Sequence, residues 1–157
     1  QIFSAETAYQ MTSILEGVVQ NGTGKKLKDL NLVLAGKTGT TNENNDAWFI
    51  GFTSKLVIGV FVGSDNPKPL GKYETGAKTA LPIFKSFLKN AVNKEDARPF
   101  KVADNILMMV IDPITGKKSV TESKKTIIEA YKKLPNEDNS NLYINNRLKN
   151  NNILRFY

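Results

Sequence analysis

An apolar segment that runs directly into a cationic, glycine-bearing and hydroxyl-rich stretch constrains this chain more than any other feature. Residues 31–36 read Asn-Leu-Val-Leu-Ala-Gly, and residues 37–40 continue as Lys-Thr-Gly-Thr. After a polar gap, residues 47–53 form a second apolar run. This pattern predicts strands over 31–36 and 47–53 that build the edge of a site. A lysine, two threonine hydroxyls and a glycine offer a carboxylate one charge, two donors and close backbone approach.

The same letters partly match the phosphate-binding loop, whose pattern is G-x-x-x-x-G-K-[ST]. Gly36, Lys37 and Thr38 supply its last three positions, but Asn31 stands where the pattern requires its first glycine. The residues between favour a strand, and those after Thr38 do not open a helix. We therefore reject a nucleotide site at this position.

K-T-G also belongs to serine acyltransferases that act on D-Ala-D-Ala-like substrates, where it accompanies S-x-x-K and S-D-N. Three residues recur by chance, but here the match is longer. It includes Ala-Gly-Lys-Thr-Gly-Thr-Thr-Asn at 35–42, Asp-Ala-Trp-Phe-Ile-Gly-Phe-Thr at 46–53, and the segments 7–24, 60–63 and 65–71. These segments closely resemble the class A penicillin-binding proteins of the 1A type. The resemblance covers roughly residues 1–134.

The resemblance implies a role for each residue of the K-T-G-T run. Lys37 sets the local positive potential and bonds toward the serine network. The hydroxyls of Thr38 and Thr40 bind the carboxylate of a stem peptide or β-lactam, and Gly39 lets the substrate backbone lie along the strand. The backbone N–H of Thr40 is one oxyanion donor. An alternative for Lys37 is an exposed edge-strand lysine that discourages aggregation.

The nucleophile is not found where the resemblance requires it. In the family, S-x-x-K and S-x-N precede K-T-G, but residues 1–36 contain neither. Ser64-Asp65-Asn66 and a Ser-x-x-Lys run beginning at Ser86 follow it, in reversed order. We expect neither serine to be the nucleophile, because of this order and because Ser86 lies between Phe84 and Phe87 on a helix expected to pack on the sheet.

The spacing of apolar residues predicts helices over 4–21 and 77–93 and a third strand over 56–63. The fold class is therefore α+β, with an antiparallel sheet of three strands flanked by helices. The resemblance implies the penicillin-binding and β-lactamase-like transpeptidase fold. Both faces of 47–53 are apolar, so we expect this strand to be covered on both sides.

The pattern changes beyond Arg98-Pro99. We expect a short strand over 106–111, a turn over 112–116 and an amphipathic helix over 122–134. That helix would turn Ile127, Ile128, Tyr131 and Leu134 inward. The predicted domains are 1–98 (the C-terminal half of a transpeptidase domain), 99–134 (a C-terminal extension) and 135–157 (an Asn-rich, disordered tail).

Composition excludes several kinds of chemistry. The chain has no histidine and no cysteine, which removes Ser-His-Asp triads, Cys-His pairs and metal centres built on those side chains. We expect no cofactor and no metal. The net charge of +7 permits a polyanionic partner, but the lysines are scattered and no nucleic-acid motif accompanies them, so we expect no nucleic-acid partner.

The resemblance implies a peptidoglycan serine D,D-transpeptidase that cross-links stem peptides ending in D-Ala-D-Ala through an acyl-enzyme and binds β-lactams. We expect this chain to be inactive alone. Its partner would be the missing N-terminal half of the domain, and the parent protein would carry a glycosyltransferase domain and a membrane anchor on the periplasmic face of the bacterial inner membrane. The chain does not begin with Met, which suggests a fragment. The alternative is a non-catalytic truncated module with a structural or partner-binding role.

Overall fold

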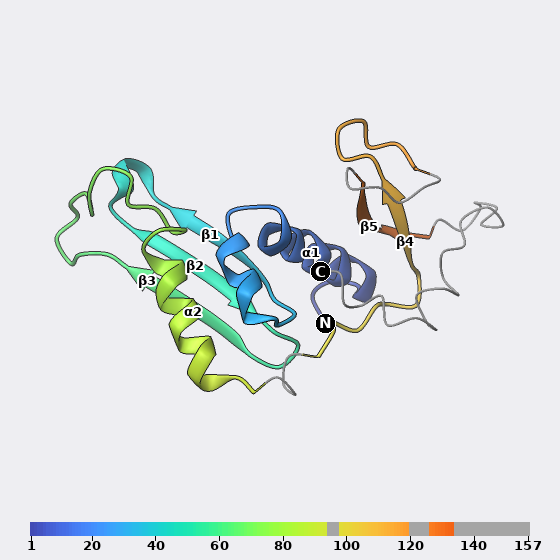
Figure 1. The fold of residues 1–157 in the computed structure, drawn as a ribbon, viewed down its shortest axis with the longest axis horizontal. Helices are drawn as coiled ribbons and strands as arrows, with labels where there is room; N and C mark the ends of the chain where they lie inside the picture. The colour runs from blue at the N-terminus through green and yellow to red at the C-terminus, as the bar shows by residue number, and fades with distance from the viewer. Residues whose placement is uncertain (94–97, 120–125, 134–157) are drawn as a thin grey trace. The chain divides into compact units, whose positions relative to one another are not determined.

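The computed structural model describes residues 1–93, 98–119 and 126–133, which form two compact units (Figure 1). Among the described residues, the larger unit lies within Leu15–Phe100, and the smaller combines Gln1–Ile14 with residues 101–119 and 126–133. Helix α1 (Ala5–Gln20) contributes residues to both. The division into 1–98, 99–134 and 135–157 stays a prediction, and the last segment lies outside the described residues.

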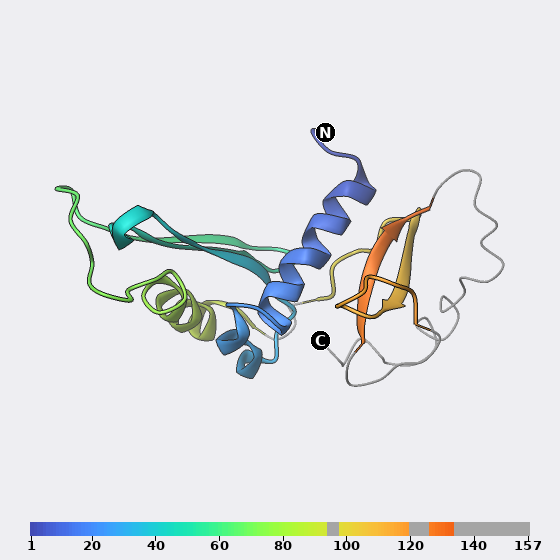
Figure 2. The same cartoon turned by 90° about the horizontal axis from the view of Figure 1, so that it is seen from above.

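A three-stranded antiparallel sheet with the strand order β1-β2-β3 forms the centre of the larger unit. Its elements in chain order are η1 (Lys25–Leu30), β1 (Ala35–Thr40), η2 (Asn42–Asn44), β2 (Ala47–Phe52), β3 (Val57–Val62) and α2 (Ala80–Ala91). Figure 2 shows η1 and α2 on the same side of the sheet. The predicted α+β architecture is therefore confirmed.

The first strand begins later than predicted, so the K-T-G residues themselves form β1. Asn31 adopts the left-handed conformation, with φ 53° and ψ 38°, and this ends η1. Leu32 and Leu34 then pack in or against the core without strand pairing. Their apolar run indicated burial, and it was wrongly assigned to a strand. Residues 35–40 are poor strand formers by composition, but they pair in full with β2.

Phe84 of α2 is the centre of the core in the larger unit. Its ring contacts Phe49 of β2 with 4.7 Å between the ring centroids. A Cβ atom at Gly51 would lie 2.6 Å from the Phe84 ring, so this glycine makes room for it. The other buried side chains of this core are Val19, Leu27, Leu34, Ala47, Ala80, Leu81 and Leu88.

The predicted helices over 4–21 and 77–93 exist as α1 and α2, and each buries a narrow face. In α2, Pro82 lies in the first turn, where proline is tolerated, whereas Phe87 and Ala91 are exposed and not part of the core. In α1, Val19 is buried, whereas Met11 and Ile14 are more than half exposed.

In the part of the chain that the structure describes, strand β2 is well covered on one face only, which corrects the expectation of cover on both. Its register places Trp48 opposite Phe61 and Phe52 opposite Val57, so these side chains share one face with Ile50. On that face the exposed fractions are 39% for Trp48, 51% for Ile50, 52% for Phe61 and 71% for Val57. We call these four side chains the open sheet face.

The smaller unit contains an antiparallel pair, β4 (Ile106–Ile111) and β5 (Ile127–Lys132). The predicted strand over 106–111 is confirmed, and so is the turn, in which Gly116 N–H donates to the Asp112 carbonyl at 2.8 Å. The predicted helix over 122–134 is wrong for 127–132. Its apolar spacing fits either structure, and pairing with the apolar β4 decides for a strand. Leu134 lies outside the described residues.

Replacement of Phe84 by Ala removes the ring that fills the space over Gly51. We expect Phe84→Ala to lower the free energy of unfolding by about 3–5 kcal/mol, because a cavity remains in the core. Phe87→Ala, on the exposed side of the same helix, is the matched control and changes it by less than about 1 kcal/mol. Urea denaturation followed through Trp48 fluorescence measures both, and equal effects would contradict the assigned orientation of α2.

Candidate functional site

Lys37 and Thr38 meet at the edge of β1 that faces away from β2. We call it the free edge, because no described strand pairs with it. Lys37 pairs with Ile50, so its side chain leaves β1 on the open sheet face, and Thr38 starts on the opposite face. The Lys37 ammonium nevertheless donates to the Thr38 carbonyl at 2.8 Å and approaches the Thr38 hydroxyl at 3.3 Å. The lysine therefore bends around the edge and brings its charge to the hydroxyl.

The backbone of β1 directs the Thr40 N–H toward the same free edge. Thr41 N–H donates to the Asp46 carbonyl at 3.1 Å, so Thr41 points toward the β2 side. Backbone groups alternate along an antiparallel strand, and those of Thr40 and Thr38 therefore point away from β2. This is the direction that a donor to an external oxygen requires.

The Thr40 side chain is held by the loop that precedes α2. Gly76 N–H donates to the Thr40 hydroxyl at 3.1 Å. A Cβ atom at Gly76 would lie 2.3 Å from the Trp48 carbonyl oxygen and 2.6 Å from that of Gly39, so the loop rests directly on the strand backbone. A hydroxyl that accepts this bond still carries a proton to donate. The proposed use of Thr40 toward a carboxylate stays a prediction.

The same loop is stabilised by Glu74. Its carboxylate accepts bonds from Lys78 at 2.5 Å and from the Thr79 hydroxyl at 2.7 Å. The Lys78 bond and then the Thr79 bond lower the pKa of the Glu74 carboxyl. These contacts fix the segment that contacts Thr40.

Gly39 has a structural reason to be glycine in addition to its predicted role along the substrate. It pairs with Trp48, and a Cβ atom at Gly39 would lie 3.1 Å from the Trp48 Cβ. The indole ring itself contacts Phe61, with 4.6 Å between the ring centroids. Gly39 therefore leaves room on the open sheet face for the aromatic pair.

The structure does not bring the two candidate serines to Lys37. Ser86 is exposed on α2, which packs on the sheet face opposite the one from which Lys37 projects. Ser64 follows β3, and β2 lies between β3 and β1, a separation of roughly 10 Å across two strand spacings. Both findings support the rejection of these serines as partners of this lysine.

Thr23 was not predicted as a site residue, yet its hydroxyl lies 3.1 Å from the Thr38 hydroxyl. It belongs to the loop between α1 and η1, between Gly22 and Gly24. The sequence signal for this contact was the pair Gly22 and Gly24, which marks a tight turn just after the C-terminal end of α1. Gly76 was missed as well, because nothing local shows that its loop reaches β1.

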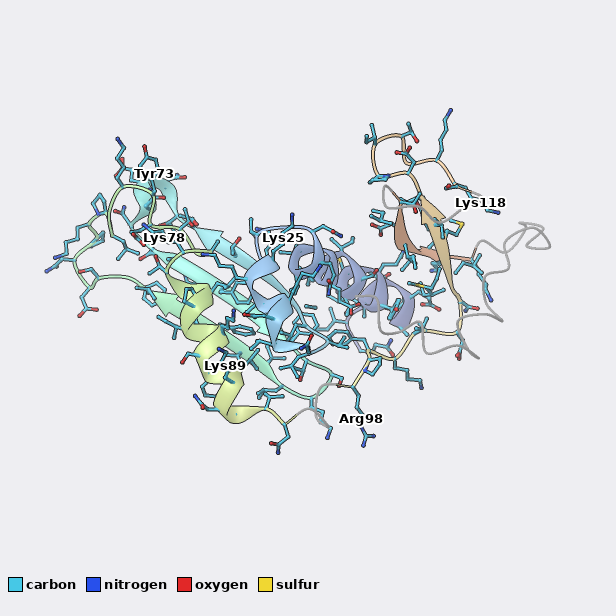
Figure 3. All side chains as sticks on the ribbon, viewed as in Figure 1. Lys25, Tyr73, Lys78, Lys89, Arg98 and Lys118 are labelled. Carbon is cyan, nitrogen blue, oxygen red and sulfur yellow. The ribbon has the colours of Figure 1, made fainter. Side chains whose placement is uncertain are left out.

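Apart from Lys37, the described basic side chains of the larger unit are spread over several elements and do not converge on the site. Figure 3 labels Lys25 on η1, Lys78 in the loop before α2 and Lys89 near the end of α2. This distribution agrees with the scattered lysines of the sequence.

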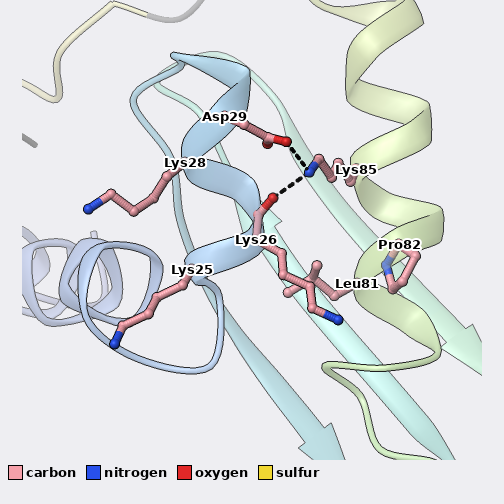
Figure 4. A pocket seen from close by; sticks show the side chains of 7 residues that line it. All are labelled: Lys25, Lys26, Lys28, Asp29, Leu81, Pro82 and Lys85. Carbon is pink, nitrogen blue, oxygen red and sulfur yellow. Dashed lines mark hydrogen bonds and ion pairs between the residues drawn. The ribbon is translucent and has the colours of Figure 1, made fainter.

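A shallow pocket lies between η1 and α2, and Lys85 spans it. The Lys85 ammonium contacts the Asp29 carboxylate and the Lys26 carbonyl, each at 2.6 Å (Figure 4). The Lys85 bond lowers the pKa of the Asp29 carboxyl. In Figure 4 the side chains of Lys25 and Lys28 point away from α2. Lys85 thus links α2 to η1, and the lysines around this pocket do not converge to form an anion-binding site.

Comparison with known proteins identifies the family. Residues 1–89 match the penicillin binding protein transpeptidase domain, and this match covers more than half of the chain. The chain therefore belongs to the penicillin-binding protein transpeptidase family, as the K-T-G strand and its flanking segments predicted.

The relatives are of the 1A type. Penicillin-binding protein 1A of Rickettsia prowazekii is 48% identical over 124 residues, which are 79% of this chain and 15% of that protein. The protein of the same name from Pseudomonas aeruginosa is 39% identical over 139 residues, which are 88% of this chain and 16% of that protein. The chain thus spans a small part of the length of these relatives.

A solved structure agrees with the fold. The crystal structure of penicillin-binding protein 1A from Haemophilus influenzae matches with a TM-score of 0.64 and 27% identity, over 82% of this chain and 20% of that chain. Within the described residues, no helix is both long and apolar enough to cross a membrane.

The close approach of Gly76 to β1 gives a testable consequence. We expect Gly76→Ala to lower the free energy of unfolding by about 1–3 kcal/mol, because a methyl group there meets backbone atoms that cannot rotate away. Gly17→Ala is the control, since nothing lies within 4 Å of its Cβ position. Gly17 lies within α1 near its C-terminal end, and this replacement should raise stability by up to about 0.5–1 kcal/mol, because alanine favours the helix over glycine. Thermal denaturation separates the two, and a neutral Gly76→Ala would show that the loop does not rest on the strand.

Proposed function

We propose that this chain supplies the carboxylate clamp and one oxyanion donor of a peptidoglycan serine D,D-transpeptidase. The observation that carries this proposal is the convergence of the Lys37 ammonium and the Thr38 hydroxyl at the free edge of β1. The Thr40 N–H points toward that edge as well. The family match and the 1A-type relatives support the same assignment.

The proposed reaction has two covalent steps, formation of an acyl-enzyme and its attack by an amine. A serine oxygen attacks the carbonyl of the penultimate D-Ala while a basic lysine beside it takes the hydroxyl proton. The tetrahedral intermediate expels the terminal D-Ala as its amine, which receives that proton. An amine of a second stem peptide then attacks the acyl-enzyme carbonyl and forms the new peptide bond, while the ester bond breaks and a proton from that amine passes through the lysine to the serine oxygen.

The clamp of this chain acts on the charges of that reaction. Lys37 and Thr38 hold the terminal carboxylate, through charge-assisted bonds worth about 1.5–3 kcal/mol each. The Thr40 N–H meets the oxyanion, and loss of one such donor typically costs about 10²–10³ in rate.

The nucleophile comes from another segment of the domain. Neither Ser64 nor Ser86 reaches Lys37 in the described structure, and the chain spans 15% of the Rickettsia prowazekii relative. We therefore assign the S-x-x-K and S-x-N elements to the N-terminal half of the transpeptidase domain, and this chain is inactive without it.

The open sheet face is the docking surface for that half of the domain. It exposes four apolar side chains, Trp48, Ile50, Val57 and Phe61, beside Lys37. Full burial of such a side chain contributes about 1.5–3 kcal/mol. The same partner would pair with the outer edge of β3, which has no strand neighbour among the described residues. A docked half-domain therefore completes the core and the site on one face.

The parent protein acts on stem peptides ending in D-Ala-D-Ala and is acylated by β-lactams. As in class A proteins, it would join this activity to a glycosyltransferase domain and an anchor in the bacterial inner membrane. The site then faces the periplasm, where peptidoglycan is cross-linked.

Covalent labelling tests the proposed function. A chimera replaces the matching segment of the Rickettsia prowazekii protein with this chain, and intact mass is measured after incubation with benzylpenicillin. We expect one adduct on the chimera, outside this chain, and none on this chain alone. Lys37→Ala should slow acylation at least about tenfold, because the carboxylate loses its cation, while Lys89→Ala on the exposed side of α2 should not.

Two results would contradict the proposal. An adduct on this chain alone, at Ser64 or Ser86, would show that the nucleophile is present here. A folded chimera without an adduct would favour the non-catalytic module.

Docking can be tested through Trp48, the one tryptophan of the chain. With 5-fluorotryptophan at this position, the ¹⁹F resonance should shift and lose solvent exposure when the N-terminal half of the domain is added. Val57→Asp should weaken binding at least about tenfold, because it buries an unpaired charge. Ile83→Asp is the control, since Ile83 is half-exposed on α2. Equal effects of the two variants would place the interface elsewhere.

A further inference from the structure

The hydroxyl of Thr38 has three potential hydrogen-bond partners: Lys37, Thr23 and the carboxylate of a ligand. The number of protons and lone pairs on this hydroxyl limits how it can bond all three. A threonine hydroxyl carries one proton to donate and two lone pairs that accept. Lys37 can only donate, so its ammonium takes one lone pair of the Thr38 oxygen at 3.3 Å. Thr23 approaches the same oxygen at 3.1 Å, and either hydroxyl can be the donor there.

A bound carboxylate decides whether Thr23 or Thr38 is the donor in the hydrogen bond between their hydroxyls. An ionised carboxylate only accepts hydrogen bonds, so Thr38 must donate its single proton to it. Thr38 then has no proton for Thr23, and Thr23 must donate to the remaining lone pair of Thr38. We infer that Thr23 is a positioning residue, whose O–H bond directs the Thr38 proton toward the carboxylate of the ligand. This inference rests on the proposed function.

The loop that carries Thr23 is built to hold it in place. Gly22 N–H and Gly24 N–H both donate to the Val18 carbonyl at 3.0 Å, which closes the end of α1 on either side of Thr23. Cβ atoms at these glycines would lie 2.9 and 3.2 Å from the same carbonyl oxygen. The Gly24 carbonyl also accepts from Leu27 N–H at 2.9 Å, which starts η1. The turn thus presents the Thr23 hydroxyl from a backbone fixed on both sides.

The arrangement forms a chain of donors that ends at the ligand. The Thr23 hydroxyl donates to the Thr38 hydroxyl, which donates to the carboxylate. The Lys37 ammonium donates to the Thr38 hydroxyl oxygen as well. Each bond polarises the next, so the Thr38 proton becomes a stronger donor than a lone hydroxyl. Without Thr23 the Thr38 hydroxyl can rotate, and part of its population points the proton away from the ligand.

The test compares ligands with and without the carboxylate, in the chimera described above. Thr23→Val should slow acylation by benzylpenicillin about 3- to 10-fold, as expected for loss of one neutral hydrogen bond. Acylation by the benzylpenicillin methyl ester, which lacks the anionic acceptor, should be unchanged. Thr23→Ser, which keeps the hydroxyl, should restore the rate. Thr12→Val is the matched control, because its hydroxyl bonds the Ala8 carbonyl within α1.

A double variant shows whether Thr23 acts through Thr38. In a Thr38→Val background, Thr23→Val should have less than about a twofold effect, because the shared partner is gone. Equal slowing of both ligands by Thr23→Val, or an undiminished effect in that background, would overturn the inference and indicate a purely structural role. Normal acylation by Thr23→Val with slow acylation by Thr38→Val would also overturn it, and the proposed function would stand. An unchanged rate in Thr38→Val would instead contradict the proposed clamp.

Discussion

The pairing of β1 with β2 is the interaction on which the rest of the larger unit depends. β1 is short and rich in glycine, so its intrinsic strand preference is weak, and within the described residues it pairs on one side only. β2 holds it in register from Ala35 opposite Phe52 to Thr40 opposite Ala47. β2 is fixed in turn by Phe49, which packs on Phe84. The position of every candidate site atom on β1 therefore depends on an aromatic contact on the core face of the sheet.

Glycine has a different function at each position in this arrangement. At Gly36 a Cβ atom would lie 2.8 Å from the Ile50 carbonyl oxygen, so this glycine permits close strand approach. Gly51 makes room for Phe84, and Gly76 for the backbone of β1 and β2. Each of these glycines gives up side-chain contacts of its own, and the stability comes from the aromatic or backbone group that moves into the space. This explains how a strand of weak propensity can be held firmly enough to present a site.

The sequence predicted the features that depend on local pattern and on long motif matches. It identified the run from Lys37 to Thr40 as the site edge, although it placed the strand itself at 31–36, and it found the antiparallel sheet of three strands and helix α2. It failed where partners distant in the chain decide the structure. Residues 127–132 have apolar spacing that suits a helix, but β4 makes them a strand. The apolar run before β1 showed burial without showing that Asn31 ends a helical turn. Thr23 and Gly76 lie 15 and 36 residues from their hydrogen-bond partners on β1, and no local pattern reports such a contact.

The open sheet face and the free edge of β1 are adjacent, and this adjacency ties the assembly of the domain to its chemistry. Lys37 leaves the strand on the face that carries Trp48 and Ile50, so a half-domain that covers those side chains also covers the base of the lysine. Removal of water there lowers the local dielectric constant and strengthens the attraction between the ammonium and a carboxylate. The ammonium itself remains at the edge, bonded to Thr38, where a ligand can reach it. In the proposed assembly, a single docking event would thus bury the apolar face, bring in the nucleophile and strengthen the clamp, which gives a physical reason for the inactivity proposed for the chain alone.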